Sequence, residues 1–394
     1  MRDSAAEPRP RALEFFAGVG LARLGLERAG FEVVWSNDRD PVKQAMYAAH
    51  FRDGPGHPYL VDDVGQVRPH QLPGGADLAW ASSPCTDLSL AGTRSGLAGP
   101  QSSAFWLWVE LLAGLGSEAP AVLVLENVTG LASSHGGADL RAAIQGLNRL
   151  GHSVDLLVLD ARRFLPQSRP RLFLVGAKDP PASDNAASEL RPRWTEPFHD
   201  DPSLRTHRAP LPAPPPLRDS GLDDLVEDLS ADDPRWWGPE RRAAFLGSLS
   251  PGQARRLDQL SLAETVTHRT AYRRTRQGQA RWEVRADPVA GCLRTARGGS
   301  SKQAVVRLGR GQVQSRWLTP LECARLMGAD DFELAGARVN QAWFAFGDAV
   351  AVPVVEWLAR ECLLPLTNGR HRLAPAADRP VAAALSDPGP VPQL

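Results

Sequence analysis

Short apolar runs alternate with segments of helical spacing along the first half of the chain. The apolar runs predict strands at residues 12–17, 31–35, 77–80, 121–125, 153–159 and 172–176, and a further short segment that closes at 62–64. Apolar residues recur at helical spacing at 21–29, 41–51, 103–115 and 140–150. Strands that alternate with helices predict a mainly parallel sheet, so the expected fold class is α/β.

A glycine turn follows the first predicted strand. The apolar run ends at Gly18-Val19-Gly20 and the helical spacing begins at Leu21, which is the strand–turn–helix order of a Rossmann-like sheet. Glycines let a ligand approach the backbone and leave the helix N-terminus open. Arg23 stands where the pattern G-x-G-x-x-G needs its third glycine, which favours a ligand without phosphates over a dinucleotide. A tight turn with no ligand is the alternative.

Two aspartates follow the next predicted strands. Asp38 lies just past the second strand, roughly 20 residues after the glycine turn, where a carboxylate can accept hydrogen bonds from both ribose hydroxyls. Asp63 lies at the end of the third segment, where a carboxylate can bind an adenine amino group. The first quarter of the chain therefore predicts a nucleotide-type cofactor pocket.

Polar side chains gather at the ends of the later predicted strands. Cys85 follows the fourth strand in the stretch ASSPCTDLSLAG, Glu126 and Asn127 follow the fifth, and QSRPR, with Arg169 and Arg171, precedes the last. A lone cysteine at a strand end is most often a small buried residue. The polar residues at the neighbouring strand ends favour a functional site instead, because α/β enzymes carry their catalytic residues at the carboxyl ends of the strands.

This set of residue types suits methylation of carbon-5 of cytosine. Carbon-5 is a poor nucleophile until a thiolate adds to carbon-6 and makes the ring enamine-like. A glutamic acid with a raised pKa can protonate N3, and a neighbouring arginine lowers the pKa of the thiol. Carbon-5 then takes a methyl group from a sulfonium donor, and loss of its proton expels the cysteine. The base has to leave the double helix, which implies a flipping pocket.

Other chemistries fit less well. A zinc deaminase needs P-C-x-x-C and an H-x-E motif, but Leu88 stands at the second cysteine position. The turn D-P-P-Y of amino-group methyltransferases begins at 179, but Ala182 supplies no aromatic ring. A papain-like protease needs a cysteine–histidine pair with a signature that is not found here.

Charge is distributed unevenly, although the formal net charge is zero. Residues 182–234 are rich in proline and carry twelve Asp and Glu against five Arg, whereas 235–317 carry seventeen Arg and Lys against five acids. Clustered arginine with flexible Gly and Ser donors suits phosphate contact. A solvated basic face is the alternative. The residues expected to contact nucleic acid are Arg273, Arg274, Arg276, Arg297, Gly298, Gly299, Ser300 and Ser301.

Cysteine usage and hydropathy narrow the class of protein. The four cysteines form no C-x-x-C pair, so we expect neither a disulfide framework nor a metal site. No run approaches the ~18 consecutive apolar residues of a membrane span. The N-terminus, MRDSAAEPRPRA, lacks the apolar region of a secretion signal. A cytoplasmic location with reduced thiols is the expectation.

The C-terminal part predicts two more helices. At 318–327 Thr319 is suited to the N-cap, Pro320 to the first helical position and Glu322 to the first turn. Residues 344–347 lead into an apolar helix at 348–362.

Together the motifs resemble those of the DNA cytosine-5 methyltransferase family, in the family's order, over residues 11 to 362. The matching segments are FFAGVG at 15–20, Asn37-Asp38, Asp63, Ser83-Pro84-Cys85, Glu126-Asn127-Val128, QSRPR at 167–171, Arg316 to Gly328 and FGDAV at 346–350. Gly291 to Ser301 resembles a stretch of some bacterial target-recognition regions. Two positions depart from the family: Thr86 stands where Gln is common, and Asp348 where the last motif usually has Asn.

The resemblance implies a function and a set of site residues. It implies S-adenosylmethionine as cofactor, S-adenosylhomocysteine as product, double-stranded DNA as partner, and a monomer. The implied catalytic residues are Cys85, Glu126, Asn127, Arg169 and Arg171. The implied cofactor-binding residues are Phe16, Ala17, Gly18, Gly20, Asp38, Asp63, Pro84, Asp348 and Ala349.

The expected architecture is a Rossmann-like methyltransferase domain with a smaller, irregular target-recognition domain. The expected segments are a disordered leader at 1–10, the catalytic domain at 11–178, the target-recognition domain at 179–315, a connecting segment at 316–343, a C-terminal helix returning to the catalytic domain at 344–364, and a disordered tail at 365–394.

Three functions remain open at this point. The first is a DNA methyltransferase, either paired with a restriction or phage-defence system or solitary. The second is a tRNA cytosine-5 methyltransferase; the long stretch between QSRPR and Arg316 speaks against it. The third is a catalytically silent DNA-binding homologue, which predicts damage at a site whose residues are all present.

Overall fold

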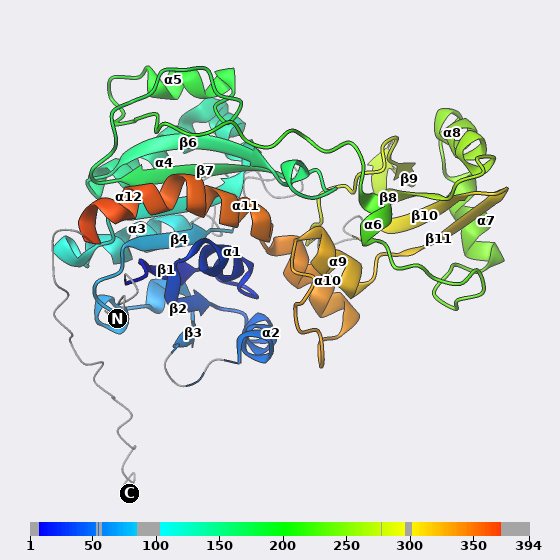
Figure 1. Ribbon diagram of the computed structural model, residues 1–394, viewed down its shortest axis with the longest axis horizontal. Coiled ribbons are helices and arrows are strands. Elements are labelled where there is room, and N and C mark those ends of the chain that lie inside the picture. The colour runs from blue at the N-terminus through cyan, green and yellow to red at the C-terminus, as the bar shows by residue number, and fades with distance from the viewer. Residues whose placement is uncertain are drawn as a thin grey trace, which may run out of the picture.

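The computed structural model describes residues 8–52, 54, 57–84, 103–276, 278–295 and 302–371. Figure 1 shows two parts, a large sheet sandwiched between helices and a small sheet with helices on one side. Cys85, Thr86 and residues 297–301 lie outside the described residues, as do most of the expected leader and tail.

The large sheet has seven strands in the order β3-β2-β1-β4-β5-β7-β6. The strands are β1 Arg11–Phe15, β2 Glu32–Asp38, β3 Tyr59–Val61, β4 Leu78–Ser82, β5 Val122–Val128, β6 Ser153–Asp160 and β7 Pro170–Ala177. The first five run parallel, as predicted, but β7 runs antiparallel to both β5 and β6. The short 161–169 connection explains this, because parallel neighbours need a crossover of a dozen or more residues.

Helices cover both faces of the large sheet. They are α1 Leu21–Ala29, α2 Pro41–Phe51, α3 Ser103–Ala113 and α4 Ala138–Arg149. One apolar layer joins α1 and the C-terminal helices to the sheet, and a second joins α3 and α4 to the opposite face. Burial on both faces explains why the predicted strands read as continuous apolar runs. Phe105 and Trp108 of α3 are fully buried in the second layer.

The small sheet is antiparallel, with the order β11-β10-β8-β9. Its strands are β8 Thr267–Arg276, β9 Gln279–Val284, β10 Ala304–Gly309 and β11 Gln312–Trp317. Helices α7 Pro239–Gly247 and α8 Pro251–Ser261 pack on one face around an aromatic cluster that includes Trp237, Phe245 and Trp282. The short helix α6 Leu222–Leu225 contacts β8.

Part of the segment expected to form the target-recognition domain packs on the large sheet. Residues 184–209, with the short helix α5 Glu196–His199, pack on β6 at the edge of the large sheet. Arg191 donates two hydrogen bonds to the fully buried carboxylate of Asp155 in β6. Phe198 joins the core under α4. The acidic, proline-rich composition of this segment did not reveal that it belongs to the large sheet.

The C-terminal helices also differ from the expectation. Residues 344–347 lie inside α10 Val339–Asp348, and α11 Val352–Leu358 begins only after a break. A π-helical turn, Ala359–Leu363, leads into α12 Leu364–His371, so the chain stays helical past the residue 365 expected to begin the tail. Helix α11 packs on α1 so closely that a Cβ at Gly25 would lie 2.5 Å from Cβ of Val355.

The stretch 339–367 is long and apolar enough to cross a membrane by length and composition alone. The share of its most apolar window that is buried inside the molecule is 61%. Its residues form much of the core against α1 and the large sheet, which accounts for the apolar composition.

Helix α9 Pro320–Leu326 begins as predicted, with Thr319 as N-cap and a capping box to Glu322. Glu322 is fully buried and also binds the guanidinium of Arg316, at 2.7 Å from Nη1 to Oε2 and through a second contact from Nη2. This carboxylate therefore joins the last strand of the small sheet to the helix that leads back to the large one.

Replacing Glu322 by Gln leaves a buried guanidinium without its counter-charge. We expect the free energy of unfolding to fall by about 3–5 kcal/mol, measured by urea denaturation. The matched control is Glu356→Gln, which removes a partly exposed ion pair with Arg360 and should cost at most about 1 kcal/mol. Equal effects of the two variants would show that Arg316 is not held by charge.

Candidate active site

The carboxyl ends of β4 and β5 lie side by side, because Ser82 pairs with Glu126 in the sheet. Glu126 and Asn127 are thus inside β5, near its end, rather than after it as predicted. Nε of Arg171 lies 2.9 Å from Oε1 of Glu126, and both side chains are largely buried. The carboxylate of Glu126 is thus held beside an arginine at the edge where β4 and β5 end.

Asn127 is hydrogen-bonded to Ser83, in the segment that leads from β4 to Cys85. Its side-chain nitrogen donates to Oγ of Ser83 at 3.1 Å, and its oxygen accepts from the backbone N–H of Val128 at 2.8 Å. Ser83 and Pro84 directly follow β4 and are the last described residues before Cys85. The start of this loop therefore lies at the same edge as Glu126.

Arg169 makes contacts of a different kind from those of Arg171. Its guanidinium is buried and donates to the backbone oxygens of Leu293, at 2.7 Å, and Gly347, at 3.0 Å, and also to that of Ala349. These carbonyls belong to segments far apart in the chain. Arg169 therefore joins three segments, which are the start of β7, the chain at Leu293 and the end of α10.

Cys292 is a thiol at this site that the sequence interpretation overlooked. Its Sγ lies 3.2 Å from Nη1 of Arg169 and 3.9 Å from Nη2 of Arg171. Burial acts to raise the pKa of the Cys292 thiol, but the guanidinium groups of Arg169, Arg171 and Arg294 outweigh it and lower the pKa. Its place within 291–301 was the only signal, and that stretch was interpreted as part of a target-recognition region.

The glycine turn has the backbone conformation that its glycines predict. Phe16, Gly18 and Gly20 all adopt positive φ, at 57°, 57° and 83°. A Cβ at Gly20 would lie 2.4 Å from the ring of Phe51 and 2.6 Å from that of Tyr47, so only glycine fits. The backbone N–H of Gly18 donates to Oδ2 of Asp38 at 2.9 Å, which places this carboxylate directly beside the turn.

Asp38 and Asp63 lie at the same edge of the sheet. Asp38 pairs with Val61 in the β2–β3 ladder, and Asn37 donates to the backbone oxygens of Leu60 and Asp62, at 2.9 Å each. Asp63 caps the next turn through a 3.0 Å bond from the N–H of Gly65. Asp38 beside the glycine turn and the exposed Asp63 at the same edge are hydrogen-bond acceptors that fit the ribose hydroxyls and the adenine amino group of S-adenosylmethionine.

Asp348 is connected to the glycine turn through the side chain of Lys43, and Ala349 follows it at the end of α10. Nζ of Lys43 lies 2.7 Å from Oδ2 of Asp348, and Cδ of Lys43 would lie 3.8 Å from a Cβ at Gly18. The end of α10 is therefore about one lysine length from the turn. Pro84 also lies near the carboxyl edge of the large sheet, directly after β4.

A buried polar network joins β1 to α1, the two elements that flank the glycine turn. Glu14 of β1 is fully buried and accepts hydrogen bonds from the N–H of Arg23, at 3.0 Å, and from Oγ of Ser36, at 3.1 Å. The hydroxyl of Tyr47 joins Ser36 and the guanidinium of Arg23. Burial raises the pKa of Glu14 to about 8. Burial therefore favours the protonated form of this carboxyl in the folded protein.

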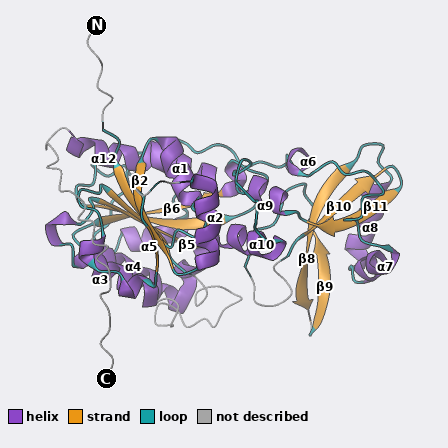
Figure 2. Cartoon of the chain, turned by 90° about the horizontal axis from the view of Figure 1, so that it is seen from below, coloured by secondary structure: helices purple, strands orange, loops and turns teal. Residues whose placement is uncertain are grey.

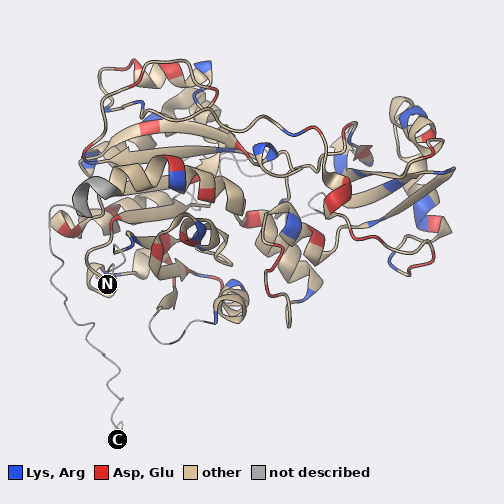
Figure 3. Ribbon diagram, viewed as in Figure 1, with Lys and Arg blue, Asp and Glu red and all other residues tan. Residues whose placement is uncertain are grey.

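The expected DNA residues divide between described and undescribed segments. Strands β8 and β9 form a hairpin that projects from the small sheet (Figure 2), and Arg273, Arg274 and Arg276 lie on it. Arg273 and Arg274 are exposed; Arg274 lies 3.3 Å from Glu283 and stacks over Tyr272. Lys and Arg are spread over the small sheet and its helices (Figure 3).

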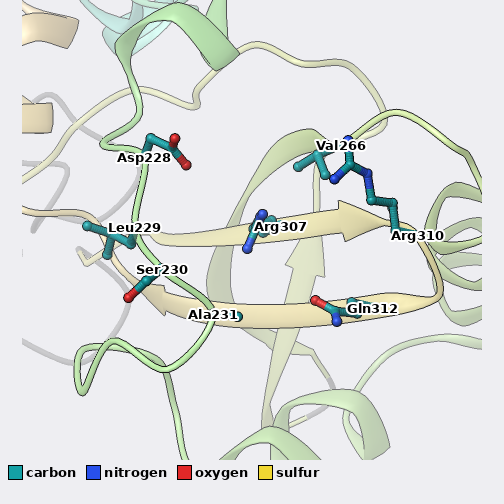
Figure 4. Close-up of a pocket in the computed structure, with 9 residues that line it drawn as sticks. Asp228, Leu229, Ser230, Ala231, Val266, Arg307, Arg310 and Gln312 are labelled. Carbon is teal, nitrogen blue, oxygen red and sulfur yellow. The ribbon is translucent and has the colours of Figure 1, made fainter.

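A cavity of about 540 Å³ lies on the small sheet, between residues 228–231 and the β10–β11 hairpin (Figure 4). Arg307, Arg310 and Gln312 are among the residues that line it. None of its lining residues belongs to the Glu126 cluster or to the glycine turn. The cavity is therefore separate from the candidate active site.

The fold and the edge of polar side chains define an α/β enzyme of the methyltransferase class. A family model of the C-5 cytosine-specific DNA methylases matches residues 11–364, and the chain belongs to this family. Membership makes it a DNA cytosine-5 methyltransferase and implies S-adenosylmethionine as methyl donor and DNA as substrate.

Individual relatives agree with the family assignment. The chain is 27% identical over 349 residues to Type II methyltransferase M.Bsp6I of Bacillus sp. (strain RFL6), covering 87% of this chain and 95% of that protein. It is 26% identical over 353 residues to M.HhaI of Haemophilus parahaemolyticus, covering 89% and 93%.

Solved structures show the same fold. The S. pombe Dnmt2 methyltransferase aligns with a TM-score of 0.58 at 15% identity, over 91% of this chain and 99% of that one. A putative DNA modification methyltransferase encoded in an E. coli prophage aligns with a TM-score of 0.54 at 18% identity, over 91% and 99%.

Glu14→Gln tests the protonated carboxyl below the glycine turn. Since the pKa of Glu14 rises from 4.5 to about 8 on folding, the folded state binds the extra proton. The stability that this proton brings is fully present below pH 4.5 and is lost as the pH rises towards 8. Glutamine is always neutral, so the stability of the variant relative to the wild type should increase across this window in urea denaturation. A constant difference would mean that Glu14 is ionised in the fold.

Proposed function

We propose that this protein methylates carbon-5 of cytosine within a specific sequence of double-stranded DNA, with Cys85 as nucleophile. The observation that carries the proposal is the edge where β4 and β5 end. There the Asn127–Ser83 bond and the Glu126–Arg171 pair lie together, directly before the Pro84-Cys85 dipeptide. We propose that the thiol of Cys85, next in the chain after Pro84, approaches this carboxyl group and arginine.

The proposed steps assign each residue one task. The thiolate of Cys85 adds to carbon-6 of a flipped cytosine while Glu126 supplies a proton to N3 and accepts a hydrogen bond from the exocyclic amine. Arg171 holds Oε1 of Glu126, and we propose that Oε2 contacts the base. S-adenosylmethionine, when bound, supplies a methyl group to carbon-5. Loss of the carbon-5 proton to solvent then re-forms the C5–C6 double bond and expels Cys85 as thiolate, and N3 returns its proton to Glu126.

The cofactor positions follow from the glycine turn. We propose that Asp38 binds the ribose hydroxyls, that Asp63 binds the adenine amino group, and that the turn at Phe16, Ala17, Gly18 and Gly20 approaches the rest of the ligand. Pro84, Asp348 and Ala349 complete the pocket in this proposal. The positive φ angles of the turn and its contact with Asp38 support this assignment.

DNA is the proposed partner, and the β8–β9 hairpin with residues 297–301 is the proposed contact surface. The catalytic protein is proposed to act as a monomer in the cytoplasm. The names of the similar Type II methyltransferases favour a role beside a restriction endonuclease, although a phage-defence or solitary enzyme would share the same chemistry. Bisulfite sequencing of DNA from a host that expresses the protein would identify the methylated site.

Covalent trapping tests the nucleophile. Duplex DNA containing 5-fluorocytosine should form a stable adduct with the wild type, because fluorine cannot leave as the carbon-5 proton does. Cys85→Ser should form none, whereas the control Cys292→Ser should still form it. A peptide map that finds the adduct on Cys292 would contradict the assignment of Cys85.

Glu126→Gln tests the acid. Loss of general acid catalysis should lower the rate of tritiated methyl transfer to DNA by about 10²–10⁴.

Parallel assays of the wild type on DNA and on tRNA distinguish the substrates. Transfer to tRNA in place of DNA would support the RNA enzyme. Transfer to neither nucleic acid would support the catalytically silent homologue.

Arg274→Ala tests the DNA surface. Each phosphate contact that is lost should reduce the slope of log binding constant against log salt concentration by about 1. We expect this reduction in fluorescence anisotropy titrations with mixed-sequence duplex DNA. The matched control is Arg360→Ala on the far helices, which should leave the slope unchanged. An unchanged slope for Arg274→Ala would place the DNA surface elsewhere.

A further inference from the structure

The two faces of the small sheet have different chemistry. Helices α7 and α8 cover one face, where Ala271 and Val284 are buried in the apolar cluster. Side chains alternate between the two faces along each strand. Arg307 of β10 therefore lies on the opposite face, together with its ladder partners Gln314 and His268. This second face is polar and carries arginine.

Two arginines of the β8–β9 hairpin lie directly opposite each other on this polar face. Arg274 pairs with Arg281 in the ladder. Arg281 is the neighbour of Trp282, which packs towards α7 and α8, so Arg281 and Arg274 project from the other side of the sheet. Side chains in such a pair have Cβ atoms about 4.5–5.5 Å apart. Both arginines are exposed, so their guanidinium groups can converge on one ligand.

This cross-strand pair has more positive charge than its surroundings balance. Like charges directly opposite each other destabilise a sheet. Nε of Arg274 lies 3.3 Å from Oε2 of Glu283. Arg281 donates to the side-chain oxygen of Gln279 at 3.2 Å, and it has no ion-pair partner in the part of the chain that the structure describes. An anion between the two guanidinium groups would supply the missing negative charge.

Arg274 is already held in place for such a ligand. Its guanidinium carbon lies 5.0 Å from the centroid of the Tyr272 ring, and Tyr272 is the ladder partner of Glu283. A side chain that is ordered before binding loses less entropy when the ligand arrives. The planar guanidinium group, with its parallel N–H donors, matches the oxygens of a phosphate group.

The position of the pair indicates a phosphate carried by a large molecule. The hairpin projects from the small sheet (Figure 2), and no enclosed cavity surrounds the two side chains among the described residues. The hairpin also belongs to the stretch 235–317, which carries seventeen Arg and Lys against five acids. An open, basic hairpin suits the backbone of a polyanion.

We propose that Arg274 and Arg281 together form a clamp for a single phosphate group of the DNA backbone. The clamp adds Arg281, which no sequence motif indicated, to the proposed DNA surface. It also assigns one phosphate to two arginines, because the ladder brings their side chains to the same point. The proposal rests on the proposed function.

The salt dependence of DNA binding tests the clamp. The variants Arg274→Gln, Arg281→Gln and the double variant keep the length of the side chains and remove the charge. In anisotropy titrations with mixed-sequence duplex DNA, each single variant should lower the slope of log binding constant against log salt concentration by about 1. The double variant should also lower it by about 1, because the same phosphate is lost. A fall of about 2 in the double variant, or an unchanged slope in Arg281→Gln, would overturn the proposal.

The matched control is Arg255→Gln. Arg255 is an exposed arginine on α8, on the other side of the small sheet, and the substitution makes the same change in net charge. Its slope should equal that of the wild type. A fall equal to that of Arg281→Gln would mean that net charge, and not the clamp, sets the slope.

Arginine labelling tests the clamp without DNA. The full chain is treated with phenylglyoxal in inorganic phosphate and in chloride at equal ionic strength, and peptide mapping follows each arginine. Phosphate should slow the labelling of Arg274 and Arg281 but not that of Arg255. In Arg274→Gln the protection of Arg281 should be lost, and protection that persists there would contradict a shared phosphate. If the wild type neither binds nor methylates DNA, the proposed function fails, whereas this labelling still shows whether the clamp holds phosphate.

Discussion

The buried guanidinium of Arg169 is the interaction on which the arrangement of the site depends. It binds carbonyl oxygens at Leu293, Gly347 and Ala349, which the chain alone leaves more than a hundred residues from β7. A buried carbonyl without a partner is costly, so loss of the Arg169 guanidinium would destabilise the packing of these segments. Through these carbonyl groups Arg169 contacts both the end of α10, beside the proposed cofactor pocket, and the segment at Leu293 that leads to the proposed DNA-contacting residues 297–301.

The two arginines of QSRPR serve different purposes although one residue separates them. Arg171 pairs with Val128 in the β5–β7 ladder, and its guanidinium reaches Glu126. Arg169 precedes β7 and turns into the junction between the two parts of the molecule. Cys292 lies between both guanidinium groups, so its thiol senses the charge of each. The antiparallel direction of β7 makes this possible, because it brings the start of that strand to the edge where β5 ends.

Local signals predicted much of the large sheet and its helices. Helix α1 has the predicted bounds because glycines with positive φ flank it on both sides, and α2 because Asp40 caps it before Pro41. The direction of β7 and the docking of residues 184–209 on β6 were not predicted. Both depend on pairings between strands and segments that composition and spacing do not encode.

The sequence by itself determined the chemistry that this protein carries: a glycine turn, acidic residues after the second and third strands, and polar groups at the ends of β4 and β5. These follow from periodicity and from the chain order of short motifs, which act over a few residues. Only the tertiary structure decided which arginine meets Glu126, that Cys292 joins the site, and that Asp348 connects Lys43 with Thr295. Those contacts span 45 to 305 residues and depend on how whole elements pack, so no local pattern carries them.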